Sequence, residues 1–442
     1  MYRSAAQVLL LLCALLSIGL AAEKHQSGTP TANSIASKEE VSHWLHRAET
    51  HFLKMSDKDR SDVAPALCDS CLELDEVSRL AALISKIQDP EKRADATLMF
   101  VISLAASGKS DAAIRVAETL DNDRTTIPET RRSVGSRRNR AFYMVSRFQS
   151  LSHDFAAAKE TIRRIDDPEV VSSAWLRVAE NQAKAGQYEE ALVSLGKVAV
   201  TSDDSRQAKE ETRKLIAKCK AEGCKDAPRK RSQGFIAALR KASTIFGDVH
   251  VELDDLTRAE QSAQKMKGPL NRAAAWRQIA WAHYEKKDAI RCRRAIQKSL
   301  ENADAVPGPL AYQRRITYVA MADLYLELGD VESARQLIQK ANSVHLDADF
   351  FGGLNAFTTT PLLISVLVRS GDVQGAITTV ERIHEKEADM AWLTLAIVCA
   401  LEGKAGCIER KLESVGSERV KALLCAGVAV GLNERRKQQA VK

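Results

Sequence analysis

The strongest constraint on this chain is an internal repeat. One sequence pattern recurs seven times. In each copy a residue at a predicted turn, most often glycine, follows by eleven places a residue that is most often aromatic. The seven turn residues are Gly108, His153, Gly186, Lys287, Gly329, Gly371 and Gly403. The residues eleven places before these turns are Thr97, Phe142, Trp175, Trp276, Tyr318, Thr360 and Trp392. Five of these seven are aromatic in a chain that is only 5% aromatic, so the frame predicts a series of stacked structural units.

Positions after the turn follow the same frame. Five places after the turn stand Ala113, Ala158, Ala191, Cys292, Ala334, Ala376 and Ile408. Nine places after it stand Ala117, Ile162, Leu195, Ile296, Ile338, Val380 and Leu412, all apolar. The pattern predicts two helices around a tight turn, because glycine can end a helix in the left-handed conformation and small residues let helices pack closely. One pair cannot bury its apolar face alone, so neighbouring pairs are expected to stack.

Composition agrees with helices. Glycine and proline number only 21 and 10 in 442 residues, whereas all-β folds need many turns. Alanine, leucine, glutamate, arginine and lysine, which are good helix formers, recur throughout. We therefore predict an all-α fold, an α-solenoid of stacked antiparallel helix pairs.

The repeat resembles the tetratricopeptide repeat, a 34-residue helix-turn-helix unit. Residues 318–341 match that family's pattern at Tyr318, Met321, Ala322, Tyr325, Gly329, Ala334, Ile338 and Ala341. The resemblance implies a right-handed superhelix in which aromatic, glycine and alanine positions pack the repeats together. Those packing residues are Phe142, Trp175, Trp276, Tyr318, Trp392, Gly108, Gly186, Gly329, Gly371, Gly403, Ala113, Ala158, Ala191, Ala334 and Ala376. The turns are 45, 33, 101, 42, 42 and 32 residues apart, so we expect an irregular array.

The repeats also divide the chain. The predicted organisation is a signal peptide (1–22), a flexible linker (23–37), N-terminal helices (38–89), repeats (90–200), a degenerate helical segment (201–268), repeats (269–416), a C-terminal capping helix (417–433) and a loose tail (434–442). Within the N-terminal helices, 38–55 and 66–87 are each predicted as one amphipathic helix. A degenerate pair turning at Gly247 is expected within 235–266, after a helix at 204–223.

The first 22 residues have the layout of a secretory signal. Arg3 precedes an apolar run from Val8 to Leu20, and Ala21 and Ala22 follow it. The alternative is an N-terminal membrane anchor, but the run is shorter than the ~20 apolar residues that span a bilayer. We therefore expect an exported protein, periplasmic or extracellular, with no stable membrane span after cleavage.

The charge of the chain does not call for a nucleic-acid partner. Lysine and arginine number 65 against 58 acidic residues, a mild excess for this length. The densest basic run contains Arg131, Arg132, Arg137, Arg138 and Arg140. The simplest interpretation is a solvated loop between helices. The alternative is a site for an acidic polymer, and export argues against nucleic acid.

The cysteines and histidines offer weak hints of chemistry. Cys68 and Cys71 form a Cys-x-x-Cys motif that could be a redox pair, half a zinc site, a structural disulfide or two buried thiols. Cys219 and Cys224 are candidates for a local disulfide. Four further cysteines are expected as buried thiols, namely Cys292, Cys399, Cys407 and Cys425. His43, His46 and His51 lack a completing carboxylate, so we predict no metal site and no cofactor.

Phosphate loops, dinucleotide fingerprints and nucleophile elbows do not occur in the sequence, and we predict a non-enzymatic protein. The resemblance implies that the first helix of each pair lines a groove for a peptide or protein. The groove candidates are Arg140, Tyr143, Arg147, Glu180, Lys184, Arg277, Trp281, Tyr284, Asp323 and Glu327. Trp281 stands out because Trp276 already fills the packing position, and a spare tryptophan beside arginine is typical of binding hot spots. The predicted function is an interaction scaffold. Alternatives are an accessory or chaperone-like subunit of an envelope complex and a redox or metal protein using Cys68 and Cys71.

Overall fold

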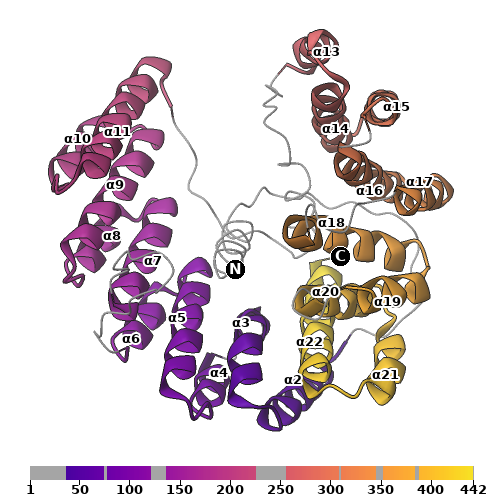
Figure 1. Cartoon of the computed structure of the whole chain (residues 1–442), viewed down its shortest axis with the longest axis horizontal. Helices are drawn as coiled ribbons and strands as arrows, with labels where there is room; N and C mark the ends of the chain where they lie inside the picture. Colours follow the sequence, from indigo (N-terminus) through magenta and orange to yellow (C-terminus); the bar gives the residue numbers. More distant parts are fainter. Residues whose placement is uncertain are drawn as a thin grey trace. The chain divides into compact units, whose positions relative to one another are not determined.

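A computed structural model describes residues 36–73, 77–120, 136–224, 255–307, 310–344, 352–383 and 388–441. These residues form twenty helices and no strand, and the helices pack in neighbouring pairs (Figure 1). The predicted all-α, solenoid-like fold is therefore confirmed. The described residues fall into two compact units: unit 1 contains 36–51 and 255–441, and unit 2 contains 52–224. None of the helices in these ranges is long and apolar enough to cross a membrane.

Unit 2 contains three helix pairs flanked by further helices. The flanking helices are α3 (Asp57–Glu73), α4 (Val77–Ile84) and α11 (Asp203–Glu222). The pairs are α5 (Pro90–Ala106) with α6 (Ser110–Ala117), α7 (Arg137–Leu151) with α8 (Phe155–Ile162), and α9 (Pro168–Lys184) with α10 (Tyr188–Gly196). The first helices of successive pairs pack side by side, α5 on α7 and α7 on α9.

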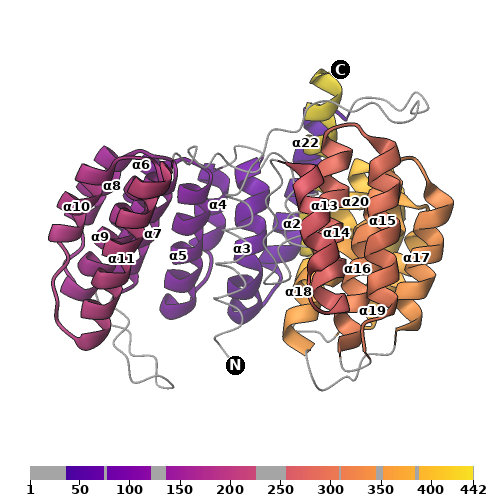
Figure 2. The ribbon, with the colours of Figure 1, turned by 90° about the horizontal axis from the view of Figure 1, so that it is seen from above.

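Unit 1 contains four pairs and is built from two separate stretches of sequence (Figure 2). The pairs are α14 (Pro269–Glu285) with α15 (Ala289–Asp304), α16 (Ala311–Glu327) with α17 (Val331–Ser343), α18 (Gly352–Arg369) with α19 (Val373–Glu381), and α20 (Ala388–Leu401) with α21 (Ala405–Ser414). The other helices are α13 (Leu256–Lys265), α22 (Glu418–Val441) and α2 (Lys38–Leu53), whose residues up to His51 belong here. First helices again pack on one another, from α14 through α20 to α22.

All seven predicted turn residues lie between the two helices of a pair and have positive φ angles. Five are glycines, and the other two are His153 (φ 63°) and Lys287 (φ 62°). In four of the seven turns an aspartate follows and accepts a hydrogen bond from the first turn of the second helix, as Asp288 does from the Arg291 N–H at 3.0 Å. The left-handed residue ends one helix and the aspartate caps the next, so the turn is encoded locally.

Lys287 is the better test of this turn, because the His153 ring stacks on Phe155. Lys287→Gly is expected to raise the free energy of unfolding by about 0.5–1 kcal/mol, because glycine adopts a positive φ without the steric penalty of a Cβ. Lys286→Gly is the control: Lys286 has φ −80°, so glycine there is expected to lower stability. Urea unfolding followed by circular dichroism measures the free energy of unfolding of both variants. If both substitutions change it in the same direction, the turn assignment is contradicted.

The repeat positions form the core of both units. All seven residues five places after the turn are fully buried, including Cys292 and Ile408. The aromatic residues Phe142, Trp276, Tyr318 and Trp392 are at most 7% exposed, whereas Trp175 is half-buried. The seven residues nine places after the turn are also buried. These side chains therefore pack within and between the helix pairs.

Several predicted boundaries are wrong. The segment 434–442 was predicted to be a loose tail, but α22 continues to Val441. The segment lacks apolar periodicity, yet it is rich in Glu, Arg, Lys, Gln and Ala, which are strong helix formers. The single helix predicted at 66–87 is replaced by α3 and α4, and α3 begins as early as Asp57. The helix expected at 204–223 is α11, but Gly247 and most of the proposed degenerate pair lie outside the described residues, as do the signal peptide and linker up to residue 35.

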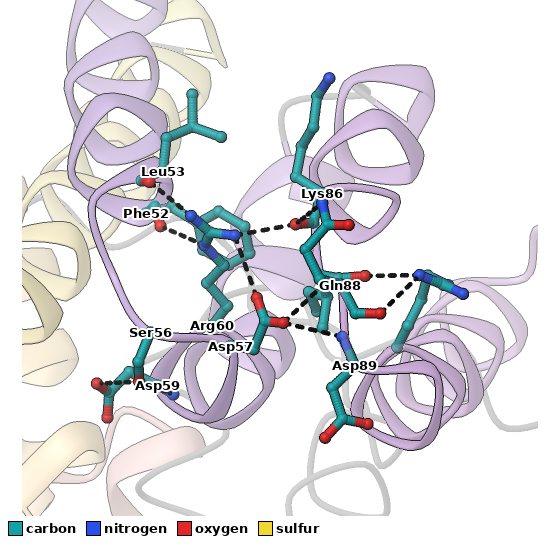
Figure 3. A network of polar contacts seen from close by, with 11 residues as sticks. Phe52, Leu53, Ser56, Asp57, Asp59, Arg60, Lys86, Gln88 and Asp89 are labelled. Carbon is teal, nitrogen blue, oxygen red and sulfur yellow. Dashed lines mark hydrogen bonds and ion pairs between the residues drawn. The ribbon is translucent and has the colours of Figure 1, made fainter.

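Arg60 and Asp57 at the start of α3 satisfy backbone groups of the neighbouring connections (Figure 3). Arg60 donates to the carbonyl oxygens of Phe52 and Leu53, at 3.2 and 2.6 Å, and to that of Lys86 at 2.9 Å. Asp57 Oδ2 accepts from the backbone N–H groups of Gln88 and Asp89, at 2.9 and 2.8 Å. Arg60 Nη1 also lies 3.2 Å from Asp57 Oδ1, so the two side chains form an ion pair. Because helix ends leave such backbone groups without intrahelical partners, this ion pair holds the entry to α5 in place.

Candidate binding face on the first helices

Five of the predicted groove residues come together in unit 1, on the first helices α14 and α16. Tyr284, near the end of α14, donates its hydroxyl to Glu327 Oε2 of α16 at 2.9 Å. The rings of Trp281 and Tyr284 meet edge to face with centroids 5.7 Å apart. Because Trp281 precedes Tyr284 by three residues, both side chains lie on the same face of α14. The aromatic pair is therefore linked to the next first helix by a hydrogen bond to a carboxylate.

Arg369, at the end of α18, extends this network. Its Nη1 donates to Asp323 Oδ1 at 2.5 Å, and its Nη2 donates to Glu327 Oε1. Its Nε lies 4.0 Å from Glu402 Oε1, just beyond α20. One guanidinium thus bonds two carboxylates of the neighbouring helix α16, and such charge-assisted hydrogen bonds are the stronger kind.

Burial differs across this cluster. The side chain of Asp323 is 1% exposed, that of Arg369 13% and that of Glu327 17%. Trp281 and Tyr284 are half-buried. The aromatic pair keeps accessible surface, while the ion pair that Tyr284 reaches through Glu327 is largely removed from water.

Two predicted groove residues are not on an accessible face. Arg277 is 1% exposed and Asp323 is fully buried. Arg277 Nη1 lies 3.5 Å from Thr317 Oγ1 of α16, and burial lowers the pKa of its guanidinium to about 10. The prediction that these two contact a partner directly is wrong. Successive first helices pack together, so these positions face the neighbouring helix instead of a groove.

Sequence reasoning missed Arg369 and Glu402. Arg369 stands two places before its turn residue, as Glu327 does before Gly329, so opposite charges occupy one repeat position on adjacent first helices. Comparing charges at equivalent positions of successive repeats would have identified this ion pair.

Unit 2 carries the remaining groove candidates on α7 and α9. Arg177 Nη1 donates to Glu180 Oε2 at 2.7 Å. Arg147 and Lys184 are half-buried, and the side chain of neither makes a hydrogen bond or ion pair within the described ranges. These side chains share the first-helix face but do not form a network like that of unit 1.

The described arginines of the basic run lie in α7 and make contacts within the fold. Arg137 Nε donates to Asp95 Oδ1 at 2.8 Å, and the Arg138 guanidinium lies 5.7 Å from the Phe142 ring centroid. Arg140 is half-buried, which lowers the pKa of its guanidinium, although Asp95 opposes this. The solvated-loop interpretation therefore does not hold for these three residues. Arg131 and Arg132 lie outside the described residues.

The cysteines act as packing residues where the structure describes them. Cys219 and Cys224 are thiols that pack in an apolar cluster with Ala191 and Leu195, so the disulfide predicted between them is not formed. Burial raises the pKa of Cys292 and of Cys399 to about 12, which disfavours their reactive thiolate form. Cys425 is buried as predicted, while Cys407 is half-buried. Cys71 is buried, and the side chain of Cys68 lies outside the described residues.

The three histidines of α2 differ in their surroundings. His43 and His46 are exposed on α2, and His51 Nδ1 lies 2.7 Å from Glu418 Oε2. Within the described ranges, no group of three or more His, Cys, Asp or Glu side chains could hold a metal ion. A pocket in unit 1 lies at the turn between α14 and α15 and is lined by Asp255, Leu256, Thr257, His283, Lys286, Asp288 and Arg291.

Comparison with known proteins adds little. No protein-family model matches the sequence, and no curated protein matches it. Among solved structures, the crystal structure of Ton1535 from Thermococcus onnurineus NA1 is 14% identical over 81% of this chain and 98% of that one, with a TM-score of 0.25. A likeness this weak supports no argument about function.

Proposed function

We propose that this chain is an exported, tetratricopeptide-like scaffold that binds a protein or peptide partner without catalysing a reaction. The observation that carries the proposal is the Trp281–Tyr284 pair on the first-helix face of unit 1. Trp276, which is 4% exposed, fills the repeat's packing position, so Trp281 is not needed there. Rigid, partly exposed aromatic side chains are the usual anchors of protein interfaces, because they contribute large contact area with little loss of conformational entropy.

The ion-pair network bonded to Tyr284 supports the same role. Tyr284 is fixed by Glu327, and Glu327 in turn by Arg369. A side chain that is already ordered loses less entropy when a partner binds, which favours affinity. Export remains part of the proposal on the sequence of residues 1–22 alone, because the layout there is that of a secretory signal.

Trp281→Ala is expected to weaken partner binding by about 30-fold, the effect of losing a hot spot worth about 2 kcal/mol. The test is affinity purification of the tagged protein from its native envelope, with quantitative comparison of the proteins recovered. Tyr284→Phe, which removes only the hydroxyl bonded to Glu327, is expected to have a smaller effect.

Ile290→Ala is the matched control. Ile290 is a 77% exposed apolar side chain on α15, the second helix of the same pair, so its loss should leave binding unchanged. Circular dichroism checks that each variant is folded. If Trp281→Ala recovers the same partners in the same amounts, the proposed binding face is wrong. A single partner recovered in stoichiometric amount would instead identify the chain as an accessory subunit.

A further inference from the structure

A row of polar side chains follows one side of helix α7 in unit 2. Arg140, Tyr143 and Arg147 are spaced by three and four residues, which places them on one face of the helix. All three are half-buried. The two arginines are about 10 Å apart along the helix axis, because each residue of an α-helix adds about 1.5 Å. The row therefore offers two cations with a phenol between them.

Helix α9 presents a second row beside the first. Arg177, Glu180 and Lys184 have the same spacing, and α9 packs alongside α7 (Figures 1 and 2). Glu180 stands six places before its turn residue, as Arg147 does on α7. Equivalent repeat positions bring the two rows to the same side of the helix pairs, so they form one first-helix face.

A hydrogen bond fixes the register of the two rows. Asn181 Nδ2 of α9 donates to Ser150 Oγ of α7 at 2.5 Å. Asn181 directly follows Glu180, and Ser150 stands one helical turn after Arg147. The middle of the second row therefore lies near the end of the first row.

In the described part of the chain, three of the four cations on this face have no carboxylate bonded to them. Arg140, Arg147 and Lys184 are half-buried, and none of these side chains makes a hydrogen bond or ion pair within the described ranges. Burial lowers the pKa of the Arg140 guanidinium, and Asp95, which opposes this, is bonded to Arg137 at 2.8 Å. Partial burial of a charge costs free energy unless an opposite charge compensates it. The face therefore has positive charge that an anionic partner can neutralise.

Other half-buried arginines of unit 2 are satisfied within the fold. Arg60 and Arg93 donate to backbone carbonyl oxygens, at 2.9 Å to that of Lys86 and 2.7 Å to that of Ile87. Arg137, at the start of α7, is bonded to a carboxylate. Unsatisfied guanidinium groups are thus a feature of the first-helix face and not of the whole unit.

We propose that this face of unit 2 is a second binding surface, and that it takes an extended peptide segment in which acidic side chains are separated by uncharged residues. An extended chain advances about 3.3 Å per residue, so carboxylates three residues apart match the spacing of Arg140 and Arg147. The surface does not depend on the Trp281–Tyr284 pair, which belongs to unit 1.

Glu180 favours a peptide over a uniformly charged polymer. Its carboxylate lies among the cations, where it can accept a hydrogen bond from a backbone N–H group of a peptide. A polymer with a negative charge on every unit would place one of them against Glu180, and juxtaposed like charges disfavour binding. A segment with spaced carboxylates avoids this repulsion.

Fluorescence anisotropy with the full chain tests the proposal. The probe is a fluorescein-labelled peptide that repeats Glu-Gly-Ser, and the reference peptide repeats Gln-Gly-Ser. The chain is expected to bind the glutamate peptide and not the glutamine peptide. Combining Arg140→Gln, Arg147→Gln and Lys184→Gln is expected to weaken binding about 30-fold, because each lost ion pair contributes about threefold.

The matched control removes the same charge from the second helices of unit 2. Arg115→Gln, Lys159→Gln and Lys197→Gln change side chains on α6, on α8 and just after α10 that make no hydrogen bond or ion pair within the described ranges. This variant is expected to bind the peptide within about twofold of the unmodified chain. Trp281→Ala should also leave peptide binding unchanged, so a failure of one surface is distinguished from a failure of the other. Circular dichroism verifies that every variant is folded.

Three results would overturn the proposal. The first is an unmodified chain that does not bind the glutamate peptide, and the second is equal weakening by the two triple variants, which would indicate non-specific attraction to net charge. The third concerns a soluble polyuronate at the same carboxylate concentration. If it binds more tightly than the peptide, and the first-helix triple variant abolishes that binding, the face recognises an acidic polysaccharide instead. Weaker binding of the polyuronate supports the peptide.

Discussion

Arg369→Met is expected to lower the free energy of unfolding by about 3–5 kcal/mol. The substitution keeps an unbranched apolar stem but removes the guanidinium that bonds Asp323 and Glu327. Asp323 is 1% exposed, so its carboxylate would stay buried without this cation. Breaking a buried ion pair is more damaging than never having formed it, since the desolvated charge is left behind.

Arg293→Met is the control for this prediction. Arg293 Nη1 bonds Asp330 Oδ2 at 3.1 Å, but the two side chains are 48% and 28% exposed, and loss of such a pair is expected to change stability by less than about 1 kcal/mol. Chemical denaturation measures both variants. Adding Asp323→Asn and Glu327→Gln to Arg369→Met should restore part of the lost stability. A loss below about 1 kcal/mol for Arg369→Met alone would show that the network does not act as a buried ion pair.

The second large effect is expected at Gly431 of α22. Gly431→Ala should destabilise the protein by about 1–3 kcal/mol, because the new methyl group would overlap the backbone of α20 at Ile397. The backbone oxygen cannot move aside as a flexible side chain can, so the helices must separate.

Gly416→Ala provides the comparison, since nothing lies within 4 Å of the Cβ position there and the change is expected to stay within about 0.5 kcal/mol of the parent. Thermal unfolding followed by circular dichroism measures both. Equal melting temperatures for the two variants would mean that α20 and α22 do not pack as closely as described.

The candidate site was predicted only in part. Tyr284 and Glu327 were identified from their repeat positions, and they do meet, at 2.9 Å. Asp323 was chosen by the same rule, yet it is buried, and its partner Arg369 was not found. Repeat position tells which side of a helix a residue occupies. It does not tell how closely the next first helix packs against that side.

The sequence by itself determined the seven turns, including the non-glycine turns at His153 and Lys287, and the small and apolar positions that pack each pair. These features depend on neighbours within about a dozen residues, so a single repeat carries them. Only the tertiary structure decided that Arg369 joins α18 to α16 and that α2 lies against α22. Those contacts depend on which distant helices meet, up to 367 residues apart for His51 and Glu418, and no local pattern encodes them.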